Sequence, residues 1–300
     1  MQAAWRRHER RWADNLYVYA VVSRRSGGVS VGVNLNPGKE CNFDCIYCQV
    51  DRKVPPVTRK VDLERLAAEL DRVLGAERDG SLYEAMPFSV LDPDRRGVRD
   101  IAFSGDGEPT TFRGFGDAVR LAADARRRFN LDTTKLVLIT DSAYLTRPAV
   151  RDALATMDAN NGEVWAKLDA GTEEYFRLID RPNVSLKTIL DNILATARVR
   201  PIVIQTLWIR ILHPNAAAAL GAPRGGAVPP AAEVDAYCAR LNELLAAGAH
   251  LKAIQMHTIA RPPAEKYASP LADAELDAIA ATVAARVKVP VETYYGVAQG

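Results

Sequence analysis

The stretch CNFDCIYC, from Cys41 to Cys48, holds three of the four cysteines of the 300-residue chain. The three are spaced C-x3-C-x2-C, and Tyr47 stands directly before the last of them. Four cysteines in a chain of this length are too few for a disulfide framework. In a reducing compartment, clustered thiols indicate metal or redox chemistry before they indicate disulfides.

The composition is that of an ordinary globular protein. The chain is 48% hydrophobic and 25% charged, which allows a sizeable core and excludes a disordered chain. Its net charge of +2 does not demand a polyanionic partner. The basic residues Arg6, Arg7, Arg10 and Arg11 favour a solvated face over a nucleic-acid patch. Since the chain lacks an apolar signal core and any run of about 18 apolar residues, we expect a cytoplasmic protein with no membrane segment.

Strand and helix patterns alternate along the chain. Buried or β-rich runs predict strands over 29–35, 99–105, 135–140, 163–170, 201–212 and 251–259, with a last one over 289–296. Helical spacing predicts helices over 62–74, 115–129, 185–199, 231–248 and 271–287, and another near Pro148. Six such units predict an α/β fold with a parallel sheet, a partial (β/α)6 barrel of TIM type. We expect an N-terminal extension over 1–28, one barrel domain over 29–300 and a short C-terminal extension.

Two segments have no regular pattern. Residues 75–98 contain prolines, glycines and a charged run, which predicts either a functional loop or a disordered one. Residues 214–230 are rich in Ala, Gly and Pro and predict a flexible surface loop.

Chemically interesting residues follow the carboxyl ends of the predicted strands, where α/β proteins bind their ligands. The cysteines follow the first strand, and the segment 105–110 follows the second. Asp169 lies near the end of the fourth strand and His257 near the end of the sixth.

Three thiols suit an iron–sulfur cluster better than a structural zinc ion. Structural zinc takes four ligands, and no second cysteine or histidine pair follows downstream. Cys238 lies in a predicted helix beside Tyr237 and Leu241 and is expected to be a buried, small apolar residue. A [4Fe–4S] cluster normally takes four cysteines, so three would leave one iron open to a substrate.

The motif resembles the hallmark C-x3-C-x-aromatic-C of the radical S-adenosylmethionine (radical SAM) superfamily, matched by Cys41, Cys45, Tyr47 and Cys48. The resemblance implies one [4Fe–4S] cluster per chain, held by the three cysteines, whose open iron binds S-adenosylmethionine (SAM). It also implies reductive cleavage of SAM to a 5′-deoxyadenosyl radical that abstracts hydrogen from a substrate. Tyr47 would pack against the adenine or the cluster, with core packing as the alternative.

The segment SGDGEPT, from Ser104 to Thr110, resembles the glycine- and glutamate-containing SAM motif of the same superfamily. Two glycines permit close approach of the backbone, and a carboxylate can accept a charge-assisted hydrogen bond from an ammonium group. The resemblance implies cofactor contacts from residues Ser104, Gly105, Asp106, Gly107 and Glu108. A tight turn with a solvated Glu108 is the alternative.

Residues 23–49 and 167–182 also resemble small radical SAM proteins related to tRNA wyosine synthases. Those enzymes carry a second cluster on cysteines upstream of the motif, whereas residues 1–40 contain no cysteine. The sequence therefore does not predict a second cluster.

Further polar residues lie in predicted strands. Lys167 and Asp169 alternate along one strand and should share a face, where we favour cofactor contacts over a structural ion pair. The resemblance implies that Asp169 holds the ribose hydroxyls of SAM. Gln205 is a candidate inward-facing cofactor contact. His257 is either a satisfied core residue or a catalytic proton relay.

The leading hypothesis is a radical SAM enzyme with an unidentified substrate and a low-potential electron donor such as flavodoxin or ferredoxin. A tRNA-modifying enzyme is the alternative within this class. A non-catalytic iron–sulfur or zinc protein is the alternative outside it.

Overall fold

The computed structural model describes residues 12–212 and 226–296. The basic residues between Arg6 and Arg11 and most of the loop predicted over 214–230 lie outside the described residues. The chain forms two compact units. The first unit contains the residues up to Cys41, Val54–Thr140 and Tyr144–Val164; the second contains Asn42–Lys53, Asp141–Ala143 and the residues from Trp165 onward.

The strand order is β1-β2-β3-β4-β5-β6-β8-β10. With helices between the successive parallel strands, this topology confirms the predicted α/β fold of the partial barrel class. Strand β5 (Gly162–Lys167) contains the division between the two units. No helix among the described residues is both long enough and apolar enough to cross a membrane.

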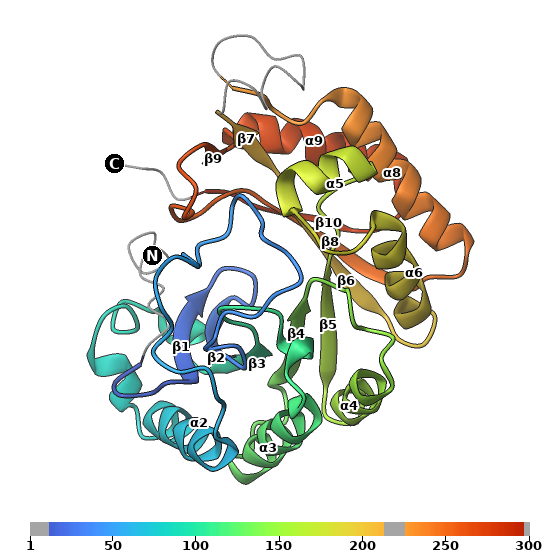
Figure 1. The fold of residues 1–300 in the computed structure, drawn as a ribbon. Coiled ribbons are helices and arrows are strands. Elements are labelled where there is room, and N and C mark those ends of the chain that lie inside the picture. The colour runs from blue at the N-terminus through green and yellow to red at the C-terminus, as the bar shows by residue number, and fades with distance from the viewer. Residues whose placement is uncertain (1–11, 213–225, 297–300) are drawn as a thin grey trace. The chain divides into compact units, whose positions relative to one another are not determined.

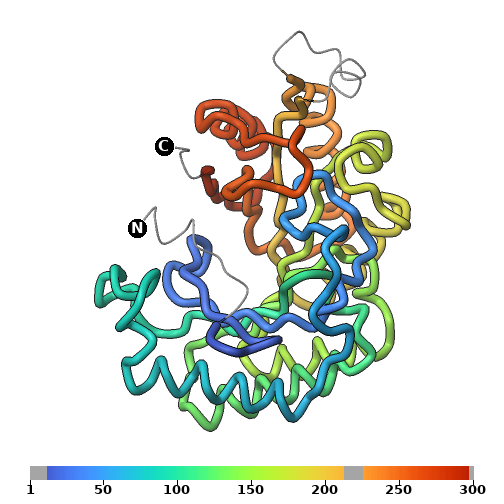
Figure 2. The backbone as a smooth tube through the Cα atoms, turned by 60° about the vertical axis from the view of Figure 1, so that its left-hand side comes forward, coloured from blue at the N-terminus to red at the C-terminus, as the bar shows by residue number. Residues whose placement is uncertain are grey.

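In the first unit, three helices lie side by side beside the strands (Figures 1 and 2). The pairs β2–β3 and β3–β4 are parallel, and β1 pairs antiparallel with β2. The strands are β1 (Val18–Ser23), β2 (Gly28–Val33), β3 (Val98–Phe103) and β4 (Lys135–Thr140). The helices are α2 (Leu63–Arg78), α3 (Phe115–Arg128) and α4 (Pro148–Asp158).

Strand β1 is not among the strands predicted from the sequence. Its residues are almost all buried, and Glu69 of α2 fixes the residues that lead into the strand. The Glu69 carboxylate accepts hydrogen bonds from the backbone amides of Leu16, Tyr17 and Val18 at 2.7–3.1 Å. A distant carboxylate therefore holds a segment that has no clear sequence pattern of its own.

The second unit also has parallel strand pairs, β6–β8 and β8–β10. Its complete strands are β6 (Ile202–Leu207), β7 (Ile209–Ile211), β8 (Leu251–His257), β9 (Ala268–Pro270) and β10 (Val291–Tyr294). Its helices are α5 (Glu173–Asp180), α6 (Leu186–Ala197), α8 (Ala231–Ala246) and α9 (Asp273–Arg286). On β8, the fully buried Ile254 and Met256 alternate with Gln255 and His257, so the two sets point to opposite faces.

The structure corrects three predictions about elements. The strand predicted over 201–212 is interrupted at Trp208, whose backbone amide bonds to the carbonyl of His257 at 2.8 Å. Helix α5 and the short strand β9 are additional. The segment predicted as an irregular loop over 75–98 contains the end of α2 and two 3-10 turns, η1 (Ser81–Glu84) and η2 (Pro93–Arg95), so it is not disordered.

Candidate functional site

In the first unit, the turn after β3 holds a buried carboxylate. Glu108 is only 2% exposed. It accepts hydrogen bonds from the amide and hydroxyl of Thr110 at 3.1 and 2.5 Å and from the hydroxyl of Thr140 at 2.8 Å. Thr140 ends β4, so two neighbouring strand ends fix the position of this carboxylate. The alternative of a solvated Glu108 is therefore wrong.

The same turn packs against the segment that leads to Cys41. The amide of Glu108 donates to the carbonyl of Glu40 at 2.9 Å. A Cβ atom at Gly107 would stand 1.9 Å from that carbonyl oxygen, which is closer than any real contact, so this position requires glycine.

Asn34, just after β2, ties the other half of the turn. Its side chain accepts from the amide of Asp106 at 3.1 Å and donates to the Asp106 carboxylate at 2.8 Å. The hydroxyl of Tyr19 lies 3.3 Å from the carbonyl oxygen of Ser104. The structure thus places all five predicted residues from Ser104 to Glu108 in one turn held by the segment before Cys41. Cys41 forms no disulfide and is half-buried.

In the second unit, the end of α5 holds the loop that carries the other two motif cysteines. The amides of Asp44 and Ile46 donate to the carbonyls of Asp180 and Ile179 at 3.0 and 2.9 Å. The Cys48 amide donates to the carbonyl of Cys45 at 3.0 Å, which closes a tight turn. Both thiols are free and half-buried.

Tyr47 is the centre of a buried charged cluster, which we call the Tyr47 network: Tyr47, Lys167, Asp169 and Asp180. Its hydroxyl bonds to the carboxylate of Asp169 and lies 2.7 Å from Asp180 Oδ1 and 2.7 Å from the Lys167 ammonium. Lys167 also pairs with Asp169 at 2.9 Å. Asp169 accepts a further bond from the amide of Leu207 at 2.7 Å, so this network joins the cysteine loop, β5, α5 and β6.

The protons of the Tyr47 network can be counted. The single phenolic hydrogen can serve only one of the two carboxylates. If Tyr47 donates to Asp169, Asp180 must donate to the phenolic oxygen and is therefore protonated. Burial, with Asp169 nearby, raises the pKa of Asp180 to about 8, which agrees with a neutral carboxyl. Burial is the largest single effect on Lys167 and lowers its pKa, but the surrounding acidic groups, led by Asp169, together outweigh burial and raise the pKa of the ammonium.

The Lys167–Asp169 pair shares one face as predicted, and the two side chains form an ion pair. A cofactor contact from either side chain stays a prediction.

The other predicted residues of the second unit lie elsewhere. Gln205 is buried and its side chain donates to Gln255 at 2.9 Å. The ring of His257 stacks on that of Tyr294 with centroids 5.0 Å apart. Cys238 is 3% exposed, as expected for a small apolar residue.

Sequence reasoning missed Asp180, although a signal was present. Phe176 and Ile179 form the buried face of the short helix α5, and Asp180 continues that face at i+4 from Phe176. A carboxylate on the apolar face of an amphipathic helix needs a buried partner, and here that partner is Tyr47. Asn42 and Asp141 form a second missed pair, at 3.0 Å.

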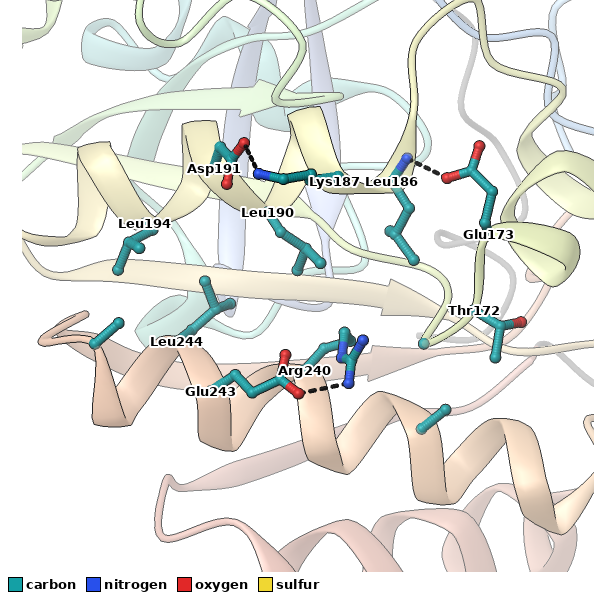
Figure 3. A pocket seen from close by; sticks show the side chains of 13 residues that line it. Thr172, Glu173, Leu186, Lys187, Leu190, Asp191, Leu194, Arg240, Glu243 and Leu244 are labelled. Carbon is teal, nitrogen blue, oxygen red and sulfur yellow. Dashed lines mark hydrogen bonds and ion pairs between the residues drawn. The ribbon is translucent and has the colours of Figure 1, made fainter.

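A separate hollow of about 750 Å³ lies between α6 and α8 in the second unit (Figure 3). Leucines line its interior, while Lys187 pairs with Asp191 and Arg240 with Glu243. None of the residues predicted for the site lines it. Within residues 12–212 and 226–296, no three His, Cys, Asp or Glu side chains are gathered as a set of metal ligands.

No protein-family model matches the chain. The UPF0026 protein MJ1312 of Methanocaldococcus jannaschii is 28% identical over 176 residues, which are 59% of this chain and 47% of that protein. GTPase Obg of Brachyspira hyodysenteriae is 28% identical over 163 residues, 54% of this chain and 20% of that protein. The chain thus spans about a fifth to about half of these two relatives. It has no G-x4-G-K-[ST] phosphate loop, since its one Gly-Lys pair is followed by Glu40.

Two solved structures share the fold. Streptococcus suis SuiB bound to S-adenosylmethionine superposes with a TM-score of 0.58 at 11% identity, over 90% of this chain and 52% of SuiB. A spore photoproduct lyase superposes with a TM-score of 0.52 at 10% identity, over 86% of this chain and 74% of the lyase. The predicted partial-barrel α/β fold is therefore confirmed, and this chain shares it with SuiB bound to S-adenosylmethionine and with spore photoproduct lyase.

Proposed function

We propose that this chain is a radical SAM enzyme in which Cys41, Cys45 and Cys48 bind one [4Fe–4S] cluster and leave one iron for SAM. One observation carries the proposal. Three half-buried cysteines that form no disulfide stand at the spacing C-x3-C-x-Tyr-C after β2, in a chain that shares its fold with SuiB bound to S-adenosylmethionine.

The chemistry of the donor atoms fits such a cluster. Thiolates are the soft ligands that iron–sulfur clusters take, and none of the three is bound in a disulfide. Burial, followed by the charge of Asp180, raises the pKa of the Cys45 thiol well above its usual range. A bound cation favours the thiolate, so iron would offset this effect. When bound, the cluster would supply the electron that cleaves SAM to methionine and a 5′-deoxyadenosyl radical.

The chain's own residues would bind SAM and hold its position. Glu108 is fixed by Thr110 and Thr140 and can accept a charge-assisted hydrogen bond from the amino group of the methionine moiety. Carbonyl groups of the turn at Gly105, Asp106 and Gly107 would supply further acceptors. The buried network around Tyr47 would keep the Cys45–Cys48 turn rigid.

Roles in the second unit extend this proposal. Lys167, Asp169 and Gln205 would meet the cofactor, and His257 would relay a proton to or from the substrate. The one-electron chemistry also requires a low-potential donor, and an acidic flavodoxin or ferredoxin fits that need. The substrate is not identified by any of these contacts.

Anaerobic reconstitution with iron and sulfide tests the proposal. The protein should turn brown, bind about four iron atoms per chain, and form 5′-deoxyadenosine from SAM when dithionite is added. Cys45→Ala should lose both the cluster and the product. Cys238→Ala is the matched control, because this buried cysteine of α8 is outside the motif, and it should retain both.

Two results would refute the proposal. One is a colourless, iron-free protein after reconstitution, which would favour zinc or no metal. The other is 5′-deoxyadenosine formation by Cys45→Ala at the rate of the unsubstituted protein.

A further inference from the structure

An exposed apolar surface lies just beyond the cysteine motif, in the loop of residues 54–60. Val54 is 55% exposed and Val57 is 70% exposed. Pro55 and Pro56 stand between them and restrict the backbone, so the two valines are displayed on a stiff segment. Exposed apolar side chains on a stiff segment are suited to contact with another protein.

The loop is anchored at both ends within the first unit. The ammonium of Lys39 donates to the carbonyl of Val54 at 2.5 Å. The hydroxyl of Tyr17 donates to the carbonyl of Lys60 at 3.1 Å. These two bonds fix the loop to the segments that flank β1 and β2.

The 54–60 loop carries positive charge without compensation. It contains Arg59 and Lys60 and no acidic residue, and both side chains are exposed. Neither makes an ion pair with another described residue. By contrast, two exposed arginines of α3, Arg120 and Arg127, each pair with an aspartate one helical turn away.

The loop lies against the part of the proposed site that belongs to the first unit. A hollow of about 200 Å³ is lined by the loop together with Asn34, Lys39 and Asp106. Lys39 precedes Cys41 by two residues, which span at most roughly 7 Å of extended chain. Asp106 belongs to the turn that holds Glu108. A protein bound to the 54–60 loop would therefore approach the segment that carries Cys41.

We propose that the 54–60 loop is the docking surface for a small, acidic electron-transfer protein that carries flavin or an iron–sulfur cluster. This inference rests on the proposed function, because that chemistry needs one external electron per SAM cleaved. An apolar centre with a charged rim is the usual anatomy of a protein interface. Small electron-transfer encounters are weak and depend on charge complementarity for their association rate.

The test compares two reductants on one protein. The double variant Arg59→Glu/Lys60→Glu reverses the charge at the edge of the surface. The double variant Val54→Ser/Val57→Ser removes its apolar centre. Formation of 5′-deoxyadenosine is measured with dithionite and with an acidic bacterial flavodoxin that has been reduced beforehand, at several salt concentrations. Arg151→Glu/Lys288→Glu is the matched control, since it changes the net charge equally at two exposed cations elsewhere.

We expect kcat/KM for flavodoxin to fall at least about tenfold in the charge reversal, equivalent to 1.4 kcal/mol, and its salt dependence to weaken. The valine variant should show a similar loss without the change in salt dependence. Dithionite-driven rates and iron content should stay within about twofold of the unsubstituted protein, since dithionite needs no docking surface.

The outcomes separate the two proposals. Unchanged flavodoxin kinetics in both variants would overturn the docking surface, as would equal losses with dithionite and flavodoxin or an equal loss in the control. Absence of dithionite-driven product from the unsubstituted protein would instead refute the proposed enzyme, and the docking surface with it.

Discussion

Replacing Lys167 with methionine tests the energetics of the Tyr47 network most directly. Methionine keeps most of the aliphatic stem and removes the ammonium. Asp169, whose side chain is only 1% exposed, would then be a buried carboxylate without its cation. Removing one partner of a buried ion pair costs about 3–5 kcal/mol. Because the Lys167 side chain is 22% exposed and partly screened by solvent, we expect the lower end, about 3 kcal/mol.

Urea unfolding followed by tryptophan fluorescence measures this loss. Trp165 and Trp208 are buried in the second unit, where the network lies. With a slope of about 2–3 kcal/mol per molar urea, the midpoint should fall by about 1–1.5 M.

Lys187→Met is the matched control. Lys187 pairs with Asp191 at 2.7 Å on the surface of α6, and the two side chains are 81% and 60% exposed. Such a pair contributes about 0.5 kcal/mol or less. A loss below about 1 kcal/mol for Lys167→Met, or a loss equal to that of the control, would refute the reasoning, because a buried pair should cost several times more.

Three further predictions follow from the same contacts. Asp180→Asn should change the pH dependence of stability: the raised pKa of about 8 means that the folded protein holds a proton that the unfolded chain releases near pH 4, so the free energy of unfolding falls from about pH 4 to about pH 8. Asparagine lacks that titration. Measured by urea unfolding, the free energy of unfolding of the variant relative to that of the unsubstituted protein should therefore be higher at pH 8 than at pH 5. The same relative free energy at both pH values would contradict this prediction. Gly107→Ala should cost about 1–3 kcal/mol through overlap with the Glu40 carbonyl, whereas Gly75→Ala, in open space on α2, should stabilise by about 0.5–1 kcal/mol, both read from thermal unfolding. Equal melting temperatures for these two variants would contradict the packing of the turn. Glu108→Gln should weaken SAM binding about 10- to 100-fold in equilibrium dialysis, since a hydrogen bond to a charged group contributes about 1.5–3 kcal/mol, and unchanged binding would exclude the proposed role of this carboxylate.

The sequence predicts the βα elements well because most of them carry a complete local signal. Strand β4 has the predicted bounds. Helix α6 begins one residue after the predicted start, because Ser185 is its N-cap and its hydroxyl accepts from the amide of Thr188 at 3.2 Å. The turn from Ser104 to Glu108 was also found, since its glycines and carboxylate stand together in the chain. Local pattern suffices wherever the residues that determine an element are neighbours in sequence.

The missed features depend instead on distant partners. Strand β1 is fixed by Glu69, about fifty residues away, and the Tyr47 hydroxyl bonds to Lys167 and Asp180, which lie 120 and 133 residues further along the chain. Helix α5 has eight residues, too few for a clear helical period. It holds the cysteine loop through contacts with Asp44, Ile46 and Tyr47, which are distant in sequence. Spacing along the chain does not report such pairings.

The attachment of the cysteine loop to α5 has a consequence for biosynthesis. The amides of Asp44 and Ile46 find their acceptors on Ile179 and Asp180, which leave the ribosome more than 130 residues later. Until then, Cys45 and Cys48 lack the support that orders their turn. An emerging polypeptide would therefore present loose, accessible sulfhydryls until α5 has been synthesised, and the proposed cluster would be inserted only after that point.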